Sequence, residues 1–140
     1  MRDILIFDRL PKKKTPVRLN KPRTRSMRYA SAMGDCYEAN GRYFMDNCHK
    51  NPNLRIVHGE VSGQGDLAGT TFGHCWVVDG ENVLDFSNGR DIRISKMIYY
   101  AIGNVEWINN YHVYDCRTFH ENLDKWGHWG CWDLKTKSGL

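Results

Sequence analysis

The sequence predicts an α+β fold in which an N-terminal helix packs on an antiparallel sheet. Three observations support this: a helical pattern over residues 36–49, a series of short apolar segments between residues 54 and 86 separated by turn residues, and further helical patterns towards the end of the chain. The chain has 140 residues, of which 41% are hydrophobic and 12% aromatic, which is enough to form the core of one domain.

The helix predicted over residues 36–49 has apolar side chains on one broad face, including Phe44 and Cys48. Asp35 precedes this segment and is expected to act as its N-cap. Pro52, which stands between two asparagines, ends the helical pattern. The first regular element of the domain is therefore expected to be this helix.

A β region is predicted to follow the helix. Residues 54–61 alternate in polarity, and a glycine-rich loop covers residues 62–69. Residues 70–78 and 81–86 are predicted as the two strands of a hairpin, with its turn at residues 79–80, Asp-Gly. The pattern therefore predicts consecutive antiparallel strands.

The remainder of the chain is expected to add two helices and one strand. Residues 96–102 form a short helical pattern that ends at Gly103, and a further strand is expected within residues 105–114. Thr118, with a glutamate three residues later, has the spacing of a capping box. The last helix is therefore expected to begin there and to end at Gly127.

Residues 1–26 are expected to form a basic, extended arm ahead of a domain at residues 27–140. Nine lysines and arginines, three prolines and no acidic residue lie within residues 9–28, whereas the rest of the chain has 11 basic and 16 acidic residues. Such an arm either contacts a polyanion, such as a nucleic acid, or serves as a solvated linker.

The composition favours neither a membrane-spanning nor a secreted protein. No apolar run approaches the length of a membrane helix, and the first ten residues, which include Asp3 and Asp8, lack the core of a signal peptide. The five cysteines are odd in number and irregular in spacing, unlike the disulfide framework of a small secreted domain. The sequence therefore predicts a cytoplasmic protein with free thiols, no cofactor and no membrane contact.

Cys36 lies in the first turn of the predicted helix, directly after Gly34 and Asp35. The unpaired N–H groups and the dipole at a helix start favour a thiolate, and they can also bind an oxyanion that forms on a substrate carbonyl. Gly34 would let a substrate approach closely. These features predict a nucleophilic cysteine, with a buried structural cysteine as the alternative.

His74 and Asp85 flank the predicted hairpin and share one face of the sheet for either of two loop lengths. A two-residue turn at residues 79–80 places them directly opposite each other, and a four-residue loop makes them diagonal neighbours. An imidazole beside a carboxylate suits a general base and the group that orients it. A structural hydrogen bond between the two side chains is the alternative.

Three short motifs occur in the order Cys, His, Asp, each at the start of a helix or on a strand. They are Gly34-x-Cys36, Gly73-His74-Cys75-Trp76 and Val83-Leu84-Asp85. This arrangement resembles the core of transglutaminase-like proteins, a branch of the papain-like cysteine enzyme superfamily, over residues 34–88. The resemblance implies a papain-like fold in which Cys36 attacks a carbonyl, His74 shuttles the proton and Asp85 holds His74.

The chain departs from the papain-like pattern at the oxyanion hole, because no glutamine stands shortly before the cysteine. Gln64, in the glycine-rich loop, is the only glutamine in the chain and is the candidate for oxyanion support. Asn88 is the alternative orienting group. Tyr37 and Trp76 are the candidates for lining the substrate site.

A zinc site is the rival interpretation of the C-terminal region. Four residues of zinc-ligand type, Cys116, His120, His128 and Cys131, fall within 16 residues of sequence. Their spacing follows no common zinc motif, and His120 falls inside a predicted helix. Scattered structural positions are therefore preferred, and no metal is assigned.

The expected function is that of a thiol-dependent enzyme acting on an amide or acyl group of a protein or peptide. The reaction is hydrolysis, deamidation or acyl transfer through a thioester on Cys36. The alternative is a catalytically silent binding protein on the same scaffold, whose basic arm contacts nucleic acid or an acidic partner. Only the first function requires an activated thiol at Cys36.

Overall fold

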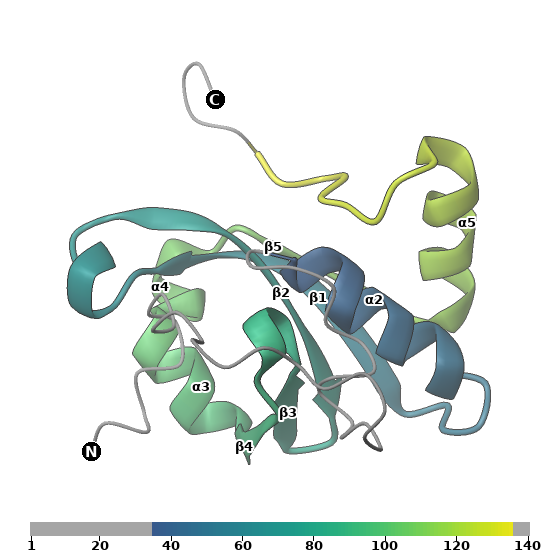
Figure 1. Cartoon of the computed structure of the whole chain (residues 1–140), viewed down its shortest axis with the longest axis horizontal. Helices are drawn as coiled ribbons and strands as arrows, with labels where there is room; N and C mark the ends of the chain where they lie inside the picture. Colours follow the sequence, from purple (N-terminus) through teal and green to yellow (C-terminus); the bar gives the residue numbers. More distant parts are fainter. Residues whose placement is uncertain (1–34, 136–140) are drawn as a thin grey trace, which may run out of the picture.

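The computed structural model describes residues 35–135, which form a five-stranded antiparallel sheet with helices on both faces (Figure 1). The strands follow the order β4-β3-β2-β1-β5, and the α+β prediction is confirmed. In chain order the elements are α2 (Cys36–Asn47), β1 (Leu54–Ser62), η2 (Gly65–Leu67), β2 (Thr71–Asp79), β3 (Asn82–Asp85), η3 (Ser87–Gly89), β4 (Ile92–Ser95), α3 (Lys96–Gly103), α4 (Val105–Ile108), β5 (Tyr111–Tyr114) and α5 (Cys116–Trp126).

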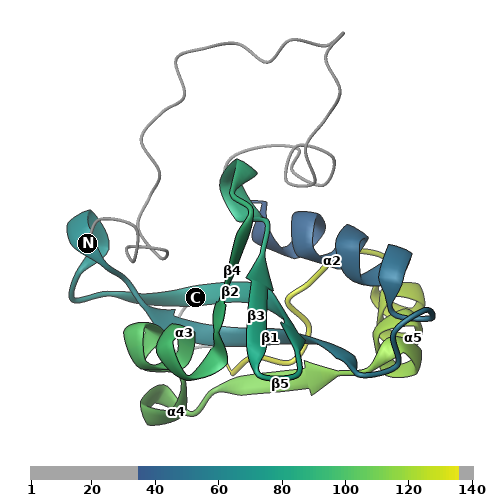
Figure 2. The ribbon, with the colours of Figure 1, turned by 90° about the horizontal axis from the view of Figure 1, so that it is seen from below.

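The sheet separates two hydrophobic cores, because successive side chains of a strand point to opposite faces. Helices α2 and α5 cover one face, where the buried residues include Phe44, Ile56, Val77, Leu84 and Phe119. Figure 2 shows these two helices close together and apart from α3 and α4. This face holds the helix that begins at Cys36.

Helices α3 and α4 cover the other face, where Trp76, Tyr99 and Val105 are fully buried. The indole of Trp76 packs over Gly59 of β1, where a Cβ atom would come within 2.7 Å of the ring. Gly59 pairs with His74 of β2 in the sheet. A glycine at this position therefore lets a large aromatic ring fill the space next to His74.

The β2–β3 hairpin turns at residues 80–81, one residue later than predicted. Asp79 pairs with Asn82, and the first turn residue is a glycine with a φ of +64°, a conformation that glycine adopts readily. The shift gives the register expected for a four-residue loop. His74 and Asp85 are therefore diagonal neighbours on one face rather than directly opposite residues.

Other boundaries differ from the prediction because polar side chains cap the helices elsewhere. Helix α5 begins at Cys116, since the Asp115 carboxylate accepts a hydrogen bond from the Thr118 N–H at 2.9 Å. Helix α3 includes Gly103 and ends at Asn104, which has a φ of +54°. Strand β4 and helix α4 were not predicted, because segments of four residues are too short to show a period.

The segment after α5 packs back onto the molecule. Trp129 and Trp132 contact the core on the α2 face, and Asp133 accepts a hydrogen bond from the hydroxyl of Tyr114. The main chain at Lys135 exchanges two hydrogen bonds with the Asn110 side chain. The segment that holds these two tryptophans is therefore part of the packed domain.

Cys48 and Cys116 form a disulfide, so the expectation of five free thiols is wrong. The two residues are 68 positions apart, but the end of α2 and the start of α5 bring their Cα atoms to 5.5 Å. Spacing along the sequence gave no sign of this contact. Cys36, Cys75 and Cys131 are free.

Several predictions concern residues that lie outside the described range. The basic arm at residues 1–26, its polyanion contact and the first residues of the domain at 27–34 are among them. Within residues 35–135, no helix has the length and hydrophobicity needed to cross a bilayer. The cytoplasmic location stays a prediction.

Candidate active site

Cys36 is the first residue of α2, and the start of this helix lies against η3, the short helix that follows β3. The Asp35 carboxylate accepts a hydrogen bond from the backbone N–H of Asn88 in η3 at 3.4 Å. Cys36 has 8% of its surface exposed. The thiol is therefore held at a fixed place beside the end of β3 while remaining partly accessible.

The first turn of α2 presents backbone donors next to this thiol. The first hydrogen bond within the helix runs from the N–H of Ala39 to the carbonyl of Asp35 at 2.8 Å. The N–H groups of Cys36 and Tyr37 precede this bond and therefore point out of the helix start, where they carry part of the positive end of the helix dipole.

His74, Asp85 and Tyr99 form a buried triangle on the α3 face of the sheet. The Nε2 atom of His74 lies 3.1 Å from Asp85 Oδ2 and 3.1 Å from the Tyr99 hydroxyl oxygen. The Tyr99 hydroxyl donates to the same Oδ2 at 2.7 Å. The exposed fractions are 7% for His74 and 0% for both partners. One carboxylate oxygen therefore accepts from a ring nitrogen and a phenol in a dry environment.

The second oxygen of Asp85 is also fully engaged. Oδ1 accepts from the backbone N–H of Ser87 at 3.0 Å, from the Ser87 hydroxyl at 2.8 Å and from Asn40 Nδ2 at 3.1 Å. A buried carboxylate is costly unless its charge is hydrogen-bonded and paired, and here both conditions are met. Asp85 is therefore fixed in position and ionised.

Asn40 separates the two strands that carry His74 and Asp85. Its Nδ2 donates to the carbonyl of Cys75 at 2.9 Å, and its Oδ1 accepts from the N–H of Phe86 at 2.9 Å. The register of β2 and β3 would pair these two backbone groups with each other, so the carboxamide replaces a ladder hydrogen bond. β3 therefore stops at Asp85 and leaves the edge of β2 beside His74 open to the start of α2.

Cys36 reaches His74 at this open edge. Burial lowers the pKa of His74, but the charges of Asp85 and Cys36 and the hydrogen bonds that the ring donates to both side chains outweigh burial and raise the pKa to about 10. At neutral pH the ring is therefore an imidazolium. Nε2 is the nitrogen that lies against Asp85.

In the same triangle, Asp85 is ionised and Tyr99 keeps its proton. Burial raises the pKa of the Asp85 carboxyl, but the His74 charge and hydrogen bonds from His74, Ser87 and Tyr99 hold it well below its usual range. Burial and the neighbouring carboxylate raise the pKa of Tyr99 well above that of an ordinary phenol. Tyr99 is therefore a neutral donor to a charged acceptor.

Gln64 and Asn88, the two further residues predicted for the site, make contacts with other parts of the fold. The amide nitrogen of Gln64 donates to the carbonyl of Ile102 near the end of α3 at 2.9 Å. The assignment of Gln64 to oxyanion support stays a prediction. Asp85 contacts His74 directly, whereas the backbone N–H of Asn88 donates to Asp35, and the orienting role of Asp85 stays a prediction.

The two predicted substrate-lining residues are packed side chains. Trp76 has no exposed surface, and its ring stacks on that of His74 at a centroid distance of 6.0 Å and an interplanar angle of 30°. The indole packs against His74 away from solvent, so the prediction that Trp76 lines the substrate site is wrong. Tyr37 is half-buried, meets the ring of His58 edge-on at 4.9 Å and holds its hydroxyl over Gly73.

The sequence analysis missed Asn40, Tyr99 and Ser87. Asn40 stands one helical turn after Cys36 on the face that also holds Phe44, so a polar residue on an apolar face was the available signal. Ser87 follows Asp85 by two positions, a spacing at which an aspartate often accepts from the backbone. Tyr99 gave no signal, because its contact depends on how α3 packs.

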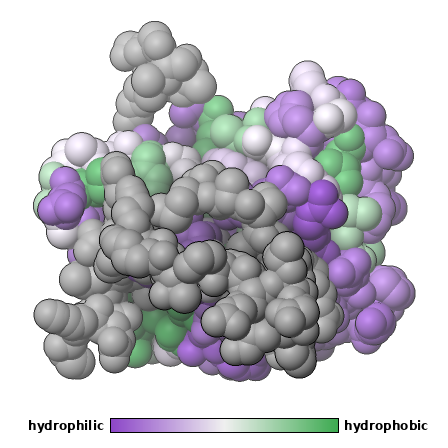
Figure 3. Space-filling model, viewed as in Figure 1, coloured by the Kyte–Doolittle hydropathy of each residue, from purple (hydrophilic) through white to green (hydrophobic). Residues whose placement is uncertain are grey.

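A hollow in the surface lies apart from these residues. Its lining comes from Glu81 and from residues of α3 and α4, including Met97 and Trp107, which are 79% and 87% exposed. Figure 3 shows hydrophobic surface in the region of α3. Neither Cys36 nor His74 lines this hollow, so it does not form part of the candidate site.

Comparison of the chain with protein-family models, with curated proteins and with solved structures gives no match. The functional interpretation therefore depends on the geometry of the site.

Proposed function

We propose that the protein is a thiol-dependent enzyme that acts on an amide or acyl group, with Cys36 as nucleophile. The observation that carries the proposal is the buried chain of contacts from Cys36 through His74 to Asp85. An imidazolium next to a cysteine stabilises the thiolate, which is the nucleophilic form. A relationship to papain-like and transglutaminase-like enzymes is part of this proposal. The main support for that relationship is the order Cys, His, Asp in the sequence.

The first half of the reaction forms a thioester. The Cys36 sulfur attacks the carbonyl carbon, a C–S bond forms, and the carbonyl electrons move onto the oxygen. His74 then gives its proton to the departing nitrogen, the C–N bond breaks, and the acyl group stays on sulfur. Asp85 retains its negative charge throughout and keeps the ring oriented.

The second half releases the acyl group. Neutral His74 takes a proton from water or from an amine, which attacks the thioester, and the C–S bond breaks. Water gives hydrolysis or deamidation, and an amine gives acyl transfer. The N–H groups of Cys36 and Tyr37 at the start of α2 are the candidate donors to the oxyanion in both halves. A protein or peptide supplies the acyl group.

The proposal is tested by comparing two free thiols of the same chain. Cys131 is exposed, whereas Cys36 is buried. Accessibility alone therefore makes Cys131 react faster with iodoacetamide. If His74 activates Cys36, mapping of the alkylated peptides at pH 6.5 shows Cys36 labelled first, and His74→Ala slows Cys36 roughly tenfold or more without affecting Cys131.

A second probe separates an enzyme from a binding scaffold. An activated ester such as p-nitrophenyl acetate should leave an acetyl group on Cys36 and not on the same site in Cys36→Ser. Labelling of Cys131 before Cys36, together with no acetylated Cys36, would contradict the enzyme. That result would favour the silent binding protein.

A further inference from the structure

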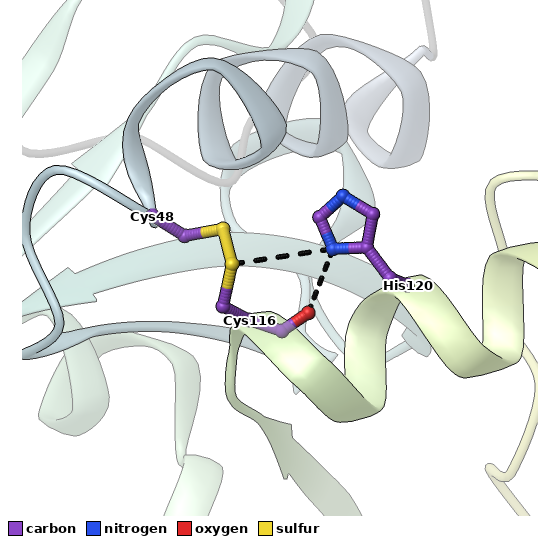
Figure 4. A group of neighbouring side chains, drawn as sticks. All are labelled: Cys48, Cys116 and His120. Carbon is purple, nitrogen blue, oxygen red and sulfur yellow. Dashed lines mark hydrogen bonds between the residues drawn. A yellow bond between two sulfur atoms is a disulfide. The ribbon is translucent and has the colours of Figure 1, made fainter.

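A second cluster of reactive side chains lies at the opposite end of α2 from Cys36. Cys48 follows the last residue of α2, and Cys116 and His120 lie on α5. The two sulfur atoms and His120 Nδ1 all lie within 4.8 Å of one another. Figure 4 shows the imidazole beside the sulfur of Cys116, with the disulfide between the two cysteines. A 12-residue helix is about 18 Å long, so this cluster is separate from the candidate active site.

We infer that Cys48, Cys116 and His120 form a binding site for a zinc-like divalent cation when the disulfide is reduced. Two thiolates and one imidazole are the ligand types that Zn²⁺ prefers, and three protein ligands leave a fourth tetrahedral position for water. The inference is independent of the proposed function, because none of its residues belongs to that site. It also differs from the sequence-based zinc interpretation, which did not include Cys48.

The backbone already holds the three ligands at suitable positions. Cys116 and His120 are four residues apart on α5, and therefore lie on one face of the helix. The distance from Cys116 Sγ to His120 Nδ1 is 4.0 Å, close to the separation of about 3.6 Å expected for sulfur and nitrogen ligands of tetrahedral zinc. The two sulfur atoms would have to move apart to about 3.8 Å, which side-chain rotation allows without moving the helices.

The local environment suits a bound cation. Cys116 is the first residue of α5, where the helix dipole stabilises a negatively charged sulfur. Cys48 is 2% exposed, so one ligand is shielded from water while the exposed His120 faces it. Metal access is therefore from the side of His120.

The site forms in two steps, reduction of the disulfide and then binding of the cation. A dithiol reductant supplies two electrons and two protons, which break the S–S bond and leave two thiols, and the reductant becomes a disulfide. The cation then displaces one proton from each thiol. His120 Nδ1 donates to the carbonyl of Cys116 at 2.8 Å in the disulfide state, so on metal binding this proton moves to Nε2, the other ring nitrogen.

The redox state provides a test that needs no substitution. The full chain is reduced with a dithiol, freed of reductant under nitrogen and titrated with Co²⁺, which gives visible d–d bands and a near-ultraviolet sulfur-to-metal band in tetrahedral sites. The reduced chain should bind one equivalent with these bands, and Zn²⁺ should displace it. The oxidised chain should give no bands. Equal bands in both states, or none in the reduced state, would overturn the inference.

Variants then assign the ligands. His120→Ala changes an exposed residue and should remove the tetrahedral bands, and Cys48→Ser should do the same. His128→Ala and Cys131→Ser are matched controls, since both residues belong only to the sequence-based zinc pattern, and they should leave the titration unchanged. Loss of the bands in these controls, with retention in His120→Ala, would contradict the assignment. The Cys36→Ser variant should also keep the tetrahedral bands, which would show that the metal does not occupy the candidate active site. Loss of the bands in this variant would overturn the inference.

Discussion

Asn40 Nδ2 donates a hydrogen bond to Asp85 Oδ1 across 3.1 Å, and so joins the helix that begins at Cys36 to the carboxylate that holds His74. The same carboxamide bonds to the backbone of both β2 and β3 at the point where the strands diverge. One side chain therefore fixes the relative positions of three elements on which the candidate site depends.

Asn40→Ala is expected to destabilise the fold by about 3 kcal/mol. The substitution leaves the carbonyl of Cys75 and the N–H of Phe86 buried without their partner, and an unsatisfied buried group costs about 1–3 kcal/mol. Urea unfolding measures the loss. Asn47→Ala is the matched control, because the Asn47 side chain donates to the carbonyl of Tyr43 within α2, and its loss should cost about 1 kcal/mol or less. Equal losses would contradict the bridging role.

The sequence predicted the elements of the site better than the contacts between them. The parity of the hairpin placed His74 and Asp85 on one face for either loop length, because side chains of a strand alternate with a period of two. The helical pattern likewise placed Cys36 at the start of α2. The meeting of Cys36 with His74 depends on where β3 stops, and that depends on Asn40, which no local pattern reveals.

The dependence on tertiary packing also explains the predictions that were wrong. Trp76 was assigned to the lining of the substrate site, but the packing of α3 and α4 on that face of the sheet leaves it with no exposed surface. The disulfide between Cys48 and Cys116 joins positions far apart in sequence, and cysteine spacing does not report such contacts. Local patterns predict faces and boundaries, whereas tertiary packing decides which faces meet.

Tyr99→Phe is expected to lower the stability of the protein at neutral pH and to flatten its loss of stability in acid. The Tyr99 hydroxyl helps to hold the pKa of Asp85 below its usual range, so its removal raises that pKa. A carboxyl with a depressed pKa contributes stability above its usual pKa of about 3.9, and this stability is lost as the pH falls through its folded value. Raising the folded pKa makes the pKa shift smaller, so the variant should be less stable above pH 4 and should lose less stability as the pH falls from there.

Urea unfolding at a series of pH values from 6 to 2 measures this shift. Tyr100→Phe is the matched control, because the hydroxyl of Tyr100 accepts a hydrogen bond from Trp76 and does not contact Asp85. An equal loss of stability between pH 4 and pH 2 in Tyr99→Phe and the unsubstituted protein would show that the Tyr99 hydroxyl does not support the carboxylate.

His58 is expected to make the protein less stable as the pH falls below about 6.5. Its ring is fully buried among aromatic side chains, and neither nitrogen has a hydrogen-bond partner within residues 35–135. Burial lowers the pKa of His58 to about 3. The unfolded chain therefore takes up a proton between pH 6.5 and 3 that the folded chain does not, which costs about 1.4 kcal/mol per pH unit.

His58→Leu should flatten this part of the pH dependence while keeping an apolar side chain in the site. The free energy of unfolding at pH 7, 6, 5 and 4 gives the slope for each protein. His112→Leu is the control, since His112 is partly exposed. A slope that is unchanged in His58→Leu would mean that His58 is not held neutral.

The pairing of Cys36 with His74 sets the protonation of the His74 ring, which ¹⁵N NMR of the ring nitrogens reports across a pH titration. We expect an imidazolium with both nitrogens protonated at pH 7, a transition near pH 10 and a lower transition in both Cys36→Ser and Asp85→Asn, since both side chains raise the pKa. The same interaction stabilises the fold below pH 6.5, and this stability is lost as the pH rises through about 10. A neutral His74 at pH 7, with a titration that is unchanged in Cys36→Ser, would contradict the pairing of Cys36 with His74.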